Sequence, residues 1–289
     1  MCRLFGMSGG RRTVRATFWL LDAPDSISVQ SHKAPDGTGL GIYDPLDRPV
    51  VYRTPRPAYE DREFVREARH VSSRTFMAHV RFASGSPVSL ENTHPFEQQG
   101  RLFGHNGVLQ KPNELETELG PDVSLVNGQT DSERFFTLIT RETERAGGDV
   151  ERGILAATNW VAEHLPVYAL NFVLTTPERV WALRYPETHE LFVLERAAGG
   201  HHLRRHFEGA SLSGLLRIRS LDLLEHRAVV IASEPLDDNP GWRLLESGEL
   251  VDVGADLGVS SRVALPGAPA HLLTYADLQA EEAASQSAT

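Results

Sequence analysis

The stretch Met1-Cys2-Arg3-Leu4-Phe5-Gly6 opens the chain and indicates both a fold and a chemistry. Cys2 is the only cysteine among 289 residues, and removal of Met1 would make it the N-terminal residue. It would then carry a thiol and a free α-amine on one Cα, a pair in which the amine can activate the nucleophile. The apolar residues that follow predict a strand over residues 2–9, which would hold the terminus inside the fold. On this stretch alone, a cysteine that lies at a fraying terminus by chance is an equal alternative.

The composition is that of a globular protein without disulfides. Hydrophobic residues at 40% and charged residues at 24% are typical of a soluble chain. The 29 Lys and Arg against 39 Asp and Glu give a net charge of −10, which argues against nucleic acid or an anionic membrane as a partner. We recognise neither a signal peptide nor an apolar run of the ~20 residues that cross a bilayer. The expected location is therefore cytoplasmic.

Strands, then two helices, then more strands follow one another along the chain. Thr130 and Glu133 have the spacing of a capping box and predict a helix from there, and residues 150–164 predict a second one. Because no βαβ rhythm is present, we expect an α+β fold with largely antiparallel sheets, built as one domain over residues 2–279. Residues 280–289 are rich in Ala, Glu, Ser and Gln and are expected to be disordered.

Two charged residues have the chemistry to hold the α-carboxylate and α-ammonium of an amino acid. Arg81 ends a predicted strand over residues 74–82, and its planar guanidinium could grip an α-carboxylate with two hydrogen bonds. A strand-end arginine that pairs with a surface acid is the commoner alternative. Asp131 could bind an α-ammonium, although a carboxylate in the first turn of a helix is favourable by itself.

His105-Asn106-Gly107 also has two interpretations. Asn-Gly after a strand is a strong hairpin signal, so a strand over residues 101–105 is expected to stop there. The alternative is an oxyanion hole, in which the Asn106 amide and the Gly107 N–H donate to one oxygen. Both can hold at once, because a turn could present the two donors on one side.

Short motifs in a fixed order identify a family. They are Met1–Gly6, Asp36–Gly39, His79–Ala83, Asn92–Pro95, His105–Gly107, Thr130–Glu133 and Ala232–Trp242. In this order they resemble the class II glutamine amidotransferases, which use an N-terminal nucleophile. The stand-alone members are the most similar, and the Ser233–Asp238 pattern is similar to that of the ergothioneine-pathway γ-glutamyl amidohydrolases. The resemblance favours Cys2 as a nucleophile over a chance cysteine.

This resemblance implies a four-layer αββα sandwich of two antiparallel sheets between helical layers, as in Ntn hydrolases. It implies that Cys2, Asn106 and Gly107 are catalytic. Arg81 and Asp131 would bind the glutamyl substrate. His94 would lie beside the pocket, where a structural hydrogen bond is an equal alternative.

Lys33 and a histidine cluster lie outside this family pattern. Many relatives carry an arginine where this chain has Lys33, and an ammonium cannot supply the guanidinium fork, so Lys33 is not assigned a catalytic role. His202 and His206 have a spacing that could bind zinc on a helix, but Arg204 and Arg205 between them favour a solvated basic loop. We therefore expect no metal and no cofactor. His79 is expected in the core or behind the site.

The predicted function is cysteine-dependent hydrolysis of glutamine or another γ-glutamyl amide through a glutamyl thioester, with glutamate and ammonia or an amine as products. The partner is then a small γ-glutamyl amide. Two alternatives stay open: an ammonia-supplying glutaminase that serves a separate synthetase, and a non-catalytic glutamine-sensing module. The identity of the leaving amine and the oligomeric state do not follow from the sequence.

Overall fold

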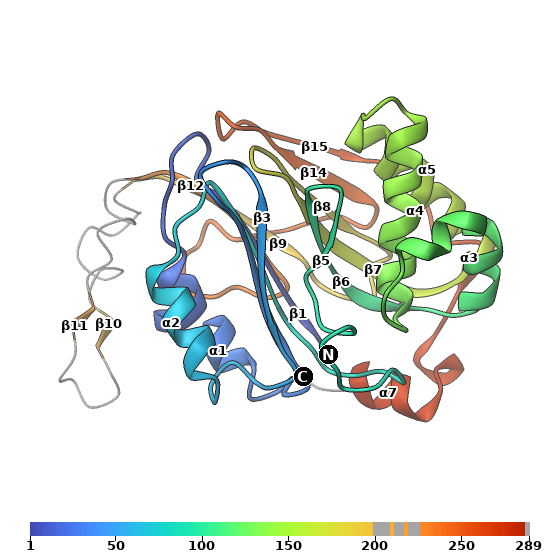
Figure 1. Cartoon of the computed structure of the whole chain (residues 1–289), viewed down its shortest axis with the longest axis horizontal. Coiled ribbons are helices and arrows are strands. Elements are labelled where there is room, and N and C mark those ends of the chain that lie inside the picture. The colour runs from blue at the N-terminus through green and yellow to red at the C-terminus, as the bar shows by residue number, and fades with distance from the viewer. Residues whose placement is uncertain (199–208, 211–216, 219–225, 287–289) are drawn as a thin grey trace.

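The computed structural model describes residues 1–198, 209–210, 217–218 and 226–286, and it arranges two β-sheets face to face between helices (Figure 1). The strands are β1 (Arg3–Ser8), β2 (Thr38–Tyr43), β3 (Pro49–Thr54), β4 (Thr75–Val80), β5 (Phe96–Gln98), β6 (Arg101–Leu109), β7 (Pro166–Thr175), β8 (Val180–Arg184), β9 (Phe192–Arg196), β10 (Gly209–Ala210), β11 (Arg217–Ile218), β12 (Ala228–Ala232), β13 (Arg243–Leu244), β14 (Glu249–Val253), β15 (Val259–Val263) and β16 (His271–Leu272). The helices are η1 (Phe18–Asp22), α1 (Ile27–Gln30), α2 (Arg62–His70), α3 (Pro112–Leu119), η2 (Gly120–Leu125), α4 (Asp131–Arg145), α5 (Val150–His164), η3 (Tyr275–Asp277) and α7 (Ala280–Gln286).

Both large sheets are antiparallel at nearly every pairing among the described residues. The first has the strand order β13-β9-β12-β1-β4-β2-β3, so β1 lies near its centre. The second has the order β15-β14-β8-β7-β6-β5, and β16 adds a short parallel pairing to β7. The α+β sandwich of two antiparallel sheets is therefore confirmed.

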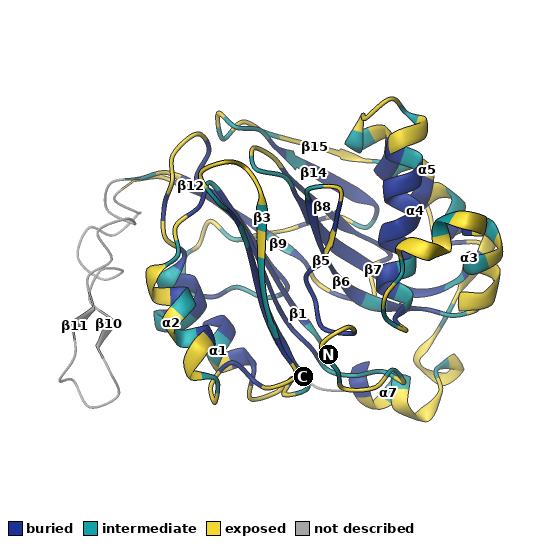
Figure 2. Ribbon diagram, viewed as in Figure 1, coloured by how far each residue is buried: buried dark blue, intermediate teal, exposed yellow. Residues whose placement is uncertain are grey.

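Apolar side chains fill three layers of core, which explains the sandwich. One cluster joins η1, α1 and α2 to the outer face of the first sheet, with Trp19 and Phe64 fully buried. A second joins α4 and α5 to the outer face of the second sheet through Phe135 and Ile154. A third fills the space between the sheets, where Leu4 is buried. Figure 2 shows this buried interior between exposed outer helix faces.

The two long helices begin where local chemistry places them. Thr130 caps α4 by accepting a hydrogen bond from the Glu133 N–H at 3.1 Å, as the spacing predicts. The Glu133 carboxylate accepts from the backbone N–H groups of Asn127 and Gly128 at 3.1 and 2.6 Å, so it fixes the preceding loop. Helix α5 has the predicted bounds, and the Asp149 side chain caps it.

Two expectations were wrong. The strand predicted to stop at residue 105 continues through Asn106 and Gly107 to Leu109, so no hairpin turn lies there. Pairing with β7 over this whole length outweighs the local turn preference. Residues 280–286, expected to be disordered, form helix α7, whose last residues Ser285 and Gln286 are buried. Tertiary contacts therefore order a segment whose composition does not.

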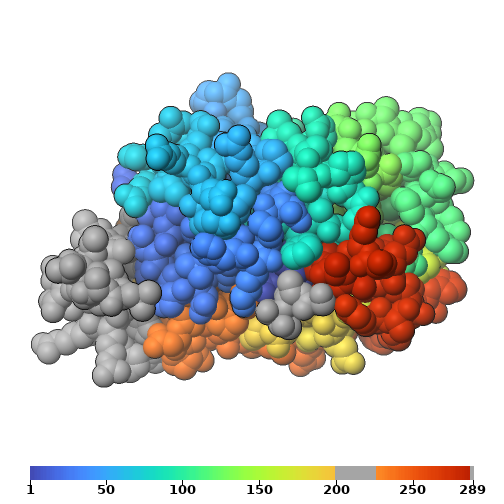
Figure 3. Space-filling view, turned by 90° about the horizontal axis from the view of Figure 1, so that it is seen from below, coloured from blue at the N-terminus to red at the C-terminus, as the bar shows by residue number. Residues whose placement is uncertain are grey.

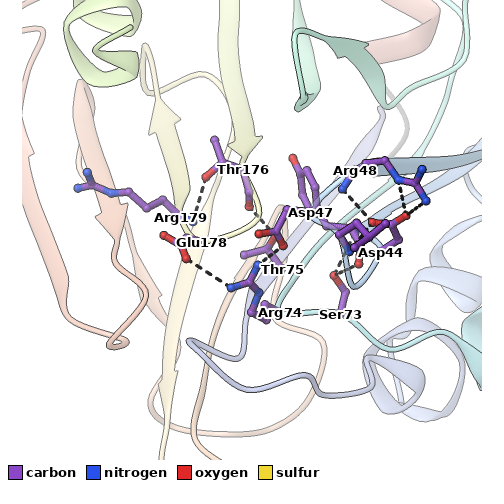
Figure 4. Close-up of polar contacts among 11 residues, drawn as sticks. Asp44, Asp47, Arg48, Ser73, Arg74, Thr75, Thr176, Glu178 and Arg179 are labelled. Carbon is purple, nitrogen blue, oxygen red and sulfur yellow. Dashed lines mark hydrogen bonds and ion pairs between the residues drawn. The ribbon is translucent and has the colours of Figure 1, made fainter.

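Polar side chains tie the two sheets together at one end of the sandwich. Figure 4 shows Arg74, which precedes β4, paired with Asp47 and with Glu178 beyond β7. The hydroxyl of Thr75 donates to the Thr176 carbonyl at 2.6 Å. Since Ser8 pairs with Thr75 whereas Arg3 pairs with Val80, this connection lies at the opposite end of β1 from Cys2.

The structure bears only partly on the predicted histidine loop and on the predicted lack of a membrane span. The histidine cluster His201, His202 and His206 lies outside the described residues. Within the part of the chain that the structure describes, none of the helices has both the length and the apolar character needed to cross a membrane.

Candidate active site

The thiol of Cys2 lies at the start of the central strand β1. The Phe82 N–H donates to its Sγ at 3.2 Å, and the thiol lies 3.4 Å from the Phe82 carbonyl. Cys2 is partly buried rather than frayed, because β1 pairs with β4 on one side and β12 on the other. The strand predicted over residues 2–9 thus holds the terminus in place.

Burial shifts both ionisable groups at this terminus. It raises the pKa of the Cys2 thiol, while the Phe82 N–H and the nearby positive charges favour the thiolate and oppose the shift. Burial also lowers the pKa of the Met1 α-amine to about 6, and the Arg3 charge acts in the same direction. An amine in this environment is therefore largely neutral near pH 7 and could accept a proton.

Arg3 fixes the direction of the terminus, a role that the sequence analysis missed. Its Nη1 donates to the carbonyls of Met1 and Cys2 at 2.9 and 3.2 Å. Its Nε donates to Glu234 Oε1 at 2.9 Å, and Arg3 itself is buried. The Leu4 N–H donates to the Ser233 hydroxyl at 2.9 Å. The only sequence signal for this arrangement was that Glu234 lies within one of the family motifs.

Asp36 holds the segment after β4, a second contribution that was not foreseen. The Ala83 N–H donates to its Oδ2 at 2.9 Å, and its own N–H donates to the Arg81 carbonyl at 2.9 Å. The Arg81 N–H donates in turn to the Gly37 carbonyl at 2.8 Å. These bonds position both the Arg81 side chain and the Phe82 amide that contacts Cys2. Lys33 is exposed near this segment.

Arg81 is buried, and its side chain bonds to the loop that follows β4. The alternative prediction, an exposed arginine that pairs with a surface acid, is therefore wrong. The relative exposure of Arg81 is 3%. Nη1 donates to the Pro87 carbonyl at 3.1 Å, and Nη2 donates to the Ser86 carbonyl at 3.1 Å and hydroxyl at 2.6 Å. Burial lowers its pKa, while the negative charges of Cys2, Asp36 and Asp131 act to raise it. The structure thus brings Arg81 within electrostatic reach of both Cys2 and Asp131.

Asp131 combines a structural role with exposure to a cavity. Its Oδ2 accepts from the Leu109 N–H at 2.8 Å, and its Oδ1 accepts from the Ser132 N–H at 2.8 Å. It also lines a cavity of about 490 Å³, together with the loop at Ser84–Ser86 and residues of α7. The carboxylate is therefore held in one orientation by the backbone and still faces an open space.

The side chain of Asn106 is the most unusual polar group in this region. On β6, Leu102 belongs to the core between the sheets, so Asn106, four residues on, points to that same side. It is 1% exposed, and neither Nδ2 nor Oδ1 has a hydrogen-bond partner among the described residues. A buried amide without partners is costly, and such a group is a candidate for ligand contact.

Gly107 presents its backbone to the open side of β6. It pairs with Leu170, whose N–H donates to the Tyr185 carbonyl at 2.6 Å, on the side of β7 away from β6. Gly107 and Leu170 are therefore a non-hydrogen-bonded pair, and the Gly107 N–H points away from β7. On that side β5 pairs only with residues 101–103. A Cβ at position 107 would lie 1.9 Å from the Ala169 carbonyl oxygen, so only glycine fits.

His94 is enclosed behind the site and does not line the cavity at Asp131. Its ring lies 4.1 Å from that of His79 and 4.5 Å from that of Phe96, measured between centroids. Burial lowers its pKa well below the ordinary value, and both ring nitrogens lack partners among the described residues. His79 is fully buried and reaches the His105 carbonyl at 3.1 Å, so it connects the two sheets as a core residue.

The sequence comparisons agree on one family. The family model described as "Glutamine amidotransferases class-II" matches residues 1–262. The gamma-glutamyl-hercynylcysteine sulfoxide hydrolase of Mycobacterium tuberculosis is 29% identical over 264 residues, covering 88% of this chain and 93% of that protein. A probable glutamine amidotransferase of Saccharomyces cerevisiae is 24% identical over 299 residues, covering 88% of this chain and 82% of its own length.

Solved structures share the fold at lower identity. The glutamine phosphoribosylpyrophosphate amidotransferase of B. subtilis matches with a TM-score of 0.64 and 20% identity over 92% of this chain. This chain spans about half of that protein, at 50% of its length. A glutamine aminotransferase class-II domain protein from Silicibacter pomeroyi matches with a TM-score of 0.58 and 21% identity, covering 90% of this chain and 98% of that one.

Proposed function

Because this chain belongs to the class II glutamine amidotransferases, we propose that it hydrolyses a γ-glutamyl amide with Cys2 as the nucleophile. The family match over residues 1–262 also supports one glutaminase domain over residues 2–279. The observation that carries the proposal is the buried Asn106 amide, which has no partner within the part of the chain that the structure describes. The next residue on the same strand, Gly107, directs its N–H to the open side. A purely structural strand has no use for that pair of donors.

The proposed reaction has two halves. After removal of Met1, the α-amine of Cys2 takes the thiol proton, and the thiolate attacks the γ-carbonyl carbon of the substrate. The Cys2 α-ammonium then gives this proton to the substrate's leaving amine. The tetrahedral intermediate collapses, the amine departs, and a glutamyl thioester remains on Cys2. Water then attacks the thioester carbon, its proton returns to the thiol, and glutamate is released. The partly buried terminus and its Arg3 contacts support this use of the amine.

The oxyanion of each tetrahedral intermediate would lie between Asn106 and Gly107. Both donors come from one strand, and their positions are fixed by pairing with β7 before any substrate binds. Such preorganised donors stabilise charge that develops only in the transition state. Because the Asn106 amide has no partner among the described residues, no bond to any of them has to break first.

Arg81 and Asp131 would bind the α-carboxylate and α-ammonium of the glutamyl group. The Asp131 carboxylate already faces the cavity. The Arg81 guanidinium donates to Ser86 and Pro87, so a substrate carboxylate would take over or share those donors. We propose that His94 acts on the substrate indirectly. Either a buried water bonds both the imidazole and the substrate, or the imidazole positions the loop that carries it.

The leaving amine is the open part of the proposal. One relative is named a gamma-glutamyl-hercynylcysteine sulfoxide hydrolase, which supports hydrolysis of a substituted γ-glutamyl amide. A second candidate is delivery of ammonia from glutamine to a separate synthetase. It is supported by the relative named a probable glutamine amidotransferase. A non-catalytic sensor would have no need for an oxyanion hole.

A panel of γ-glutamyl amides tests the proposal directly. Purified protein whose mass shows loss of Met1 is incubated with glutamine, γ-glutamyl peptides and an aromatic γ-glutamyl amide, and glutamate release is measured. The Cys2→Ala variant is the matched control. Glutamate release by the wild type that is absent in Cys2→Ala supports hydrolysis. No release from any amide by the processed protein contradicts it, whereas binding of glutamine without turnover supports a sensor.

A further inference from the structure

Helix α7 lies beside the N-terminus and away from the two helical layers of the sandwich (Figure 1). Figure 3 shows the C-terminal segment on the surface of the molecule, packed against the region that holds the 84–90 loop. Neither outer face of the sandwich needs this helix as cover, because α4, α5, α1 and α2 already cover them. Its position beside the cavity that Asp131 lines therefore calls for a separate explanation.

The first turn of α7 is attached to the end of β6. The Gln110 side-chain amide donates to Glu282 Oε2 at 2.9 Å and to the Asp277 carbonyl at 3.3 Å. Glu282 Oε2 also accepts from the Gln279 N–H at 2.9 Å. Gln110 follows directly after Leu109, whose N–H orients the Asp131 carboxylate. The helix is thus tied to the strand that carries the proposed oxyanion donors.

The last turn of α7 is buried against His189. Ser285 is 0% and Gln286 7% exposed, and Gln286 Oε1 lies 2.6 Å from His189 Nε2. Burial lowers the pKa of His189 to about 4, and the positive charges of the chain's N-terminus and Arg3 add to this effect. The His189 imidazole, which is hydrogen-bonded to Gln286, therefore lies within electrostatic reach of the N-terminal amine and Arg3.

The middle of α7 faces the loop that Arg81 holds. Glu281 and Ala284 line a cavity of about 450 Å³ with Ala83 and the Gly85–Val88 stretch. Glu281 and Glu282 also line the cavity of about 490 Å³ that contains Asp131. Helix α7 and this loop thus both line the cavity that Asp131 lines.

We propose that α7 is a specificity wall, which limits the width of the group that can accompany a γ-glutamyl moiety to Cys2. The substrate class in this inference rests on the proposed function, whereas the position of α7 does not depend on it. With the helix docked, slim amides such as glutamine reach the thiol, and amides of wide aromatic amines are excluded. Undocking the helix should therefore change selectivity between slim and wide reagents more than it changes catalysis of the slim one.

Thiol labelling tests this wall without any need for turnover. Because Cys2 is the only cysteine, a maleimide reports on this thiol alone. The small N-ethylmaleimide is compared with a pyrene-bearing maleimide on processed protein. One variant ends at Gln279, and a second, full-length variant, Glu282→Ala with Gln286→Ala, removes the two anchors. Glu163→Ala on the exposed side of α5 is the matched control.

The wide reagent should label both undocked variants about tenfold faster than the wild type, because it no longer waits for a local opening of the helix. The small reagent and the control should change by less than about threefold. An unchanged ratio of wide to small labelling in a folded variant overturns the wall. If the shortened chain fails to fold, as judged by its melting temperature, the double variant decides.

Kinetics then separate the wall from the proposed function. The ratio of kcat/KM for an aromatic γ-glutamyl anilide to that for glutamine should rise by about tenfold in the undocked variants. If no amide is hydrolysed but the labelling ratio rises, the proposed function fails and the wall stands. If amides are hydrolysed but neither ratio changes, the wall fails and the proposed function stands.

Discussion

The Arg3 guanidinium donates to the Glu234 carboxylate at 2.9 Å, and this pair joins residues 231 positions apart at the start of β1. The same guanidinium reaches the carbonyls of Met1 and Cys2. One ion pair thus connects the end of β12 to the orientation of the proposed nucleophile. Removing the carboxylate should therefore affect chemistry more than folding.

For Glu234→Gln, we expect kcat to fall about tenfold, because Arg3 loses its charged partner and the terminus loses its fixed direction. KM for the best γ-glutamyl amide should change little, since Glu234 does not contact the proposed head-group site. Steady-state kinetics and a melting curve give both values. A fall in melting temperature with full kcat would make the pair purely structural.

The mature chain should begin at Cys2. Intact-mass measurement of protein made in cells should show loss of one methionine, because the mechanism needs a free α-amine on Cys2. Homogeneous protein that keeps Met1 and has full activity would contradict the mechanism. Cys2→Ala should abolish turnover and keep the melting temperature within a few degrees.

The acidic limb of the pH profile should lie below the ordinary amine range. Burial and the Arg3 charge disfavour the charged Met1 amine and lower its pKa to about 6. We expect the same direction for the Cys2 amine after processing, so the neutral base forms below the usual ~7.7–8.0. Arg3→Gln removes a nearby positive charge, which should raise this pKa and move the limb to higher pH. A limb that does not move in Arg3→Gln argues against the amine as the base.

Arg81 and Asp131 should affect substrate binding. Arg81→Lys replaces a two-pronged donor with one ammonium, and the loss of a charged hydrogen bond of about 1.5–3 kcal/mol should raise KM by ~10–100-fold. Asp131→Asn should raise KM similarly and weaken the bond from the Leu109 N–H. Unchanged KM values, with lower melting temperatures, would leave both residues as structural supports.

Asn106→Ala tests the oxyanion hole. Loss of this donor should lower kcat by ~10²–10³ and leave KM nearly unchanged, since the bond forms only in the transition state. Because the amide has no partner in the described structure, its removal leaves no other group unsatisfied. Gly107→Ala is the contrasting variant: its Cβ would overlap the Ala169 carbonyl, so it should lose stability by about 1–3 kcal/mol or more. Near-normal kcat in folded Asn106→Ala would exclude this role.

Local patterns in the sequence predicted the elements whose signals are local. The Thr130 cap set the start of α4, and helical spacing gave α5 its bounds. The turn at Asn106-Gly107 was predicted wrongly because pairing with residues 170 and 171, far away in the chain, outweighs the dipeptide's own preference.

The candidate site could be predicted by residue type but not by arrangement. Arg81 was recognised from its chemistry, whereas its present partners, Ser86 and Pro87, depend on how the following loop folds back. The contact between Arg3 and Glu234 has no local signal, since it forms only when β12 pairs with β1. The ordering of α7 likewise depends on Gln110 and His189, and not on its own composition.

The central place of β1 has a consequence for biosynthesis. One edge of β1 pairs with β4, within the first 80 residues, but the other waits for β12 at residues 228–232. A ribosome makes these strands in order, at about 5–20 residues per second, so the unfinished sheet has an unpaired edge for many seconds. During that interval the bonds from Leu4 to Ser233 and from Arg3 to Glu234 have not yet formed. We therefore expect Met1 to be removed faster from the nascent chain than from the folded protein.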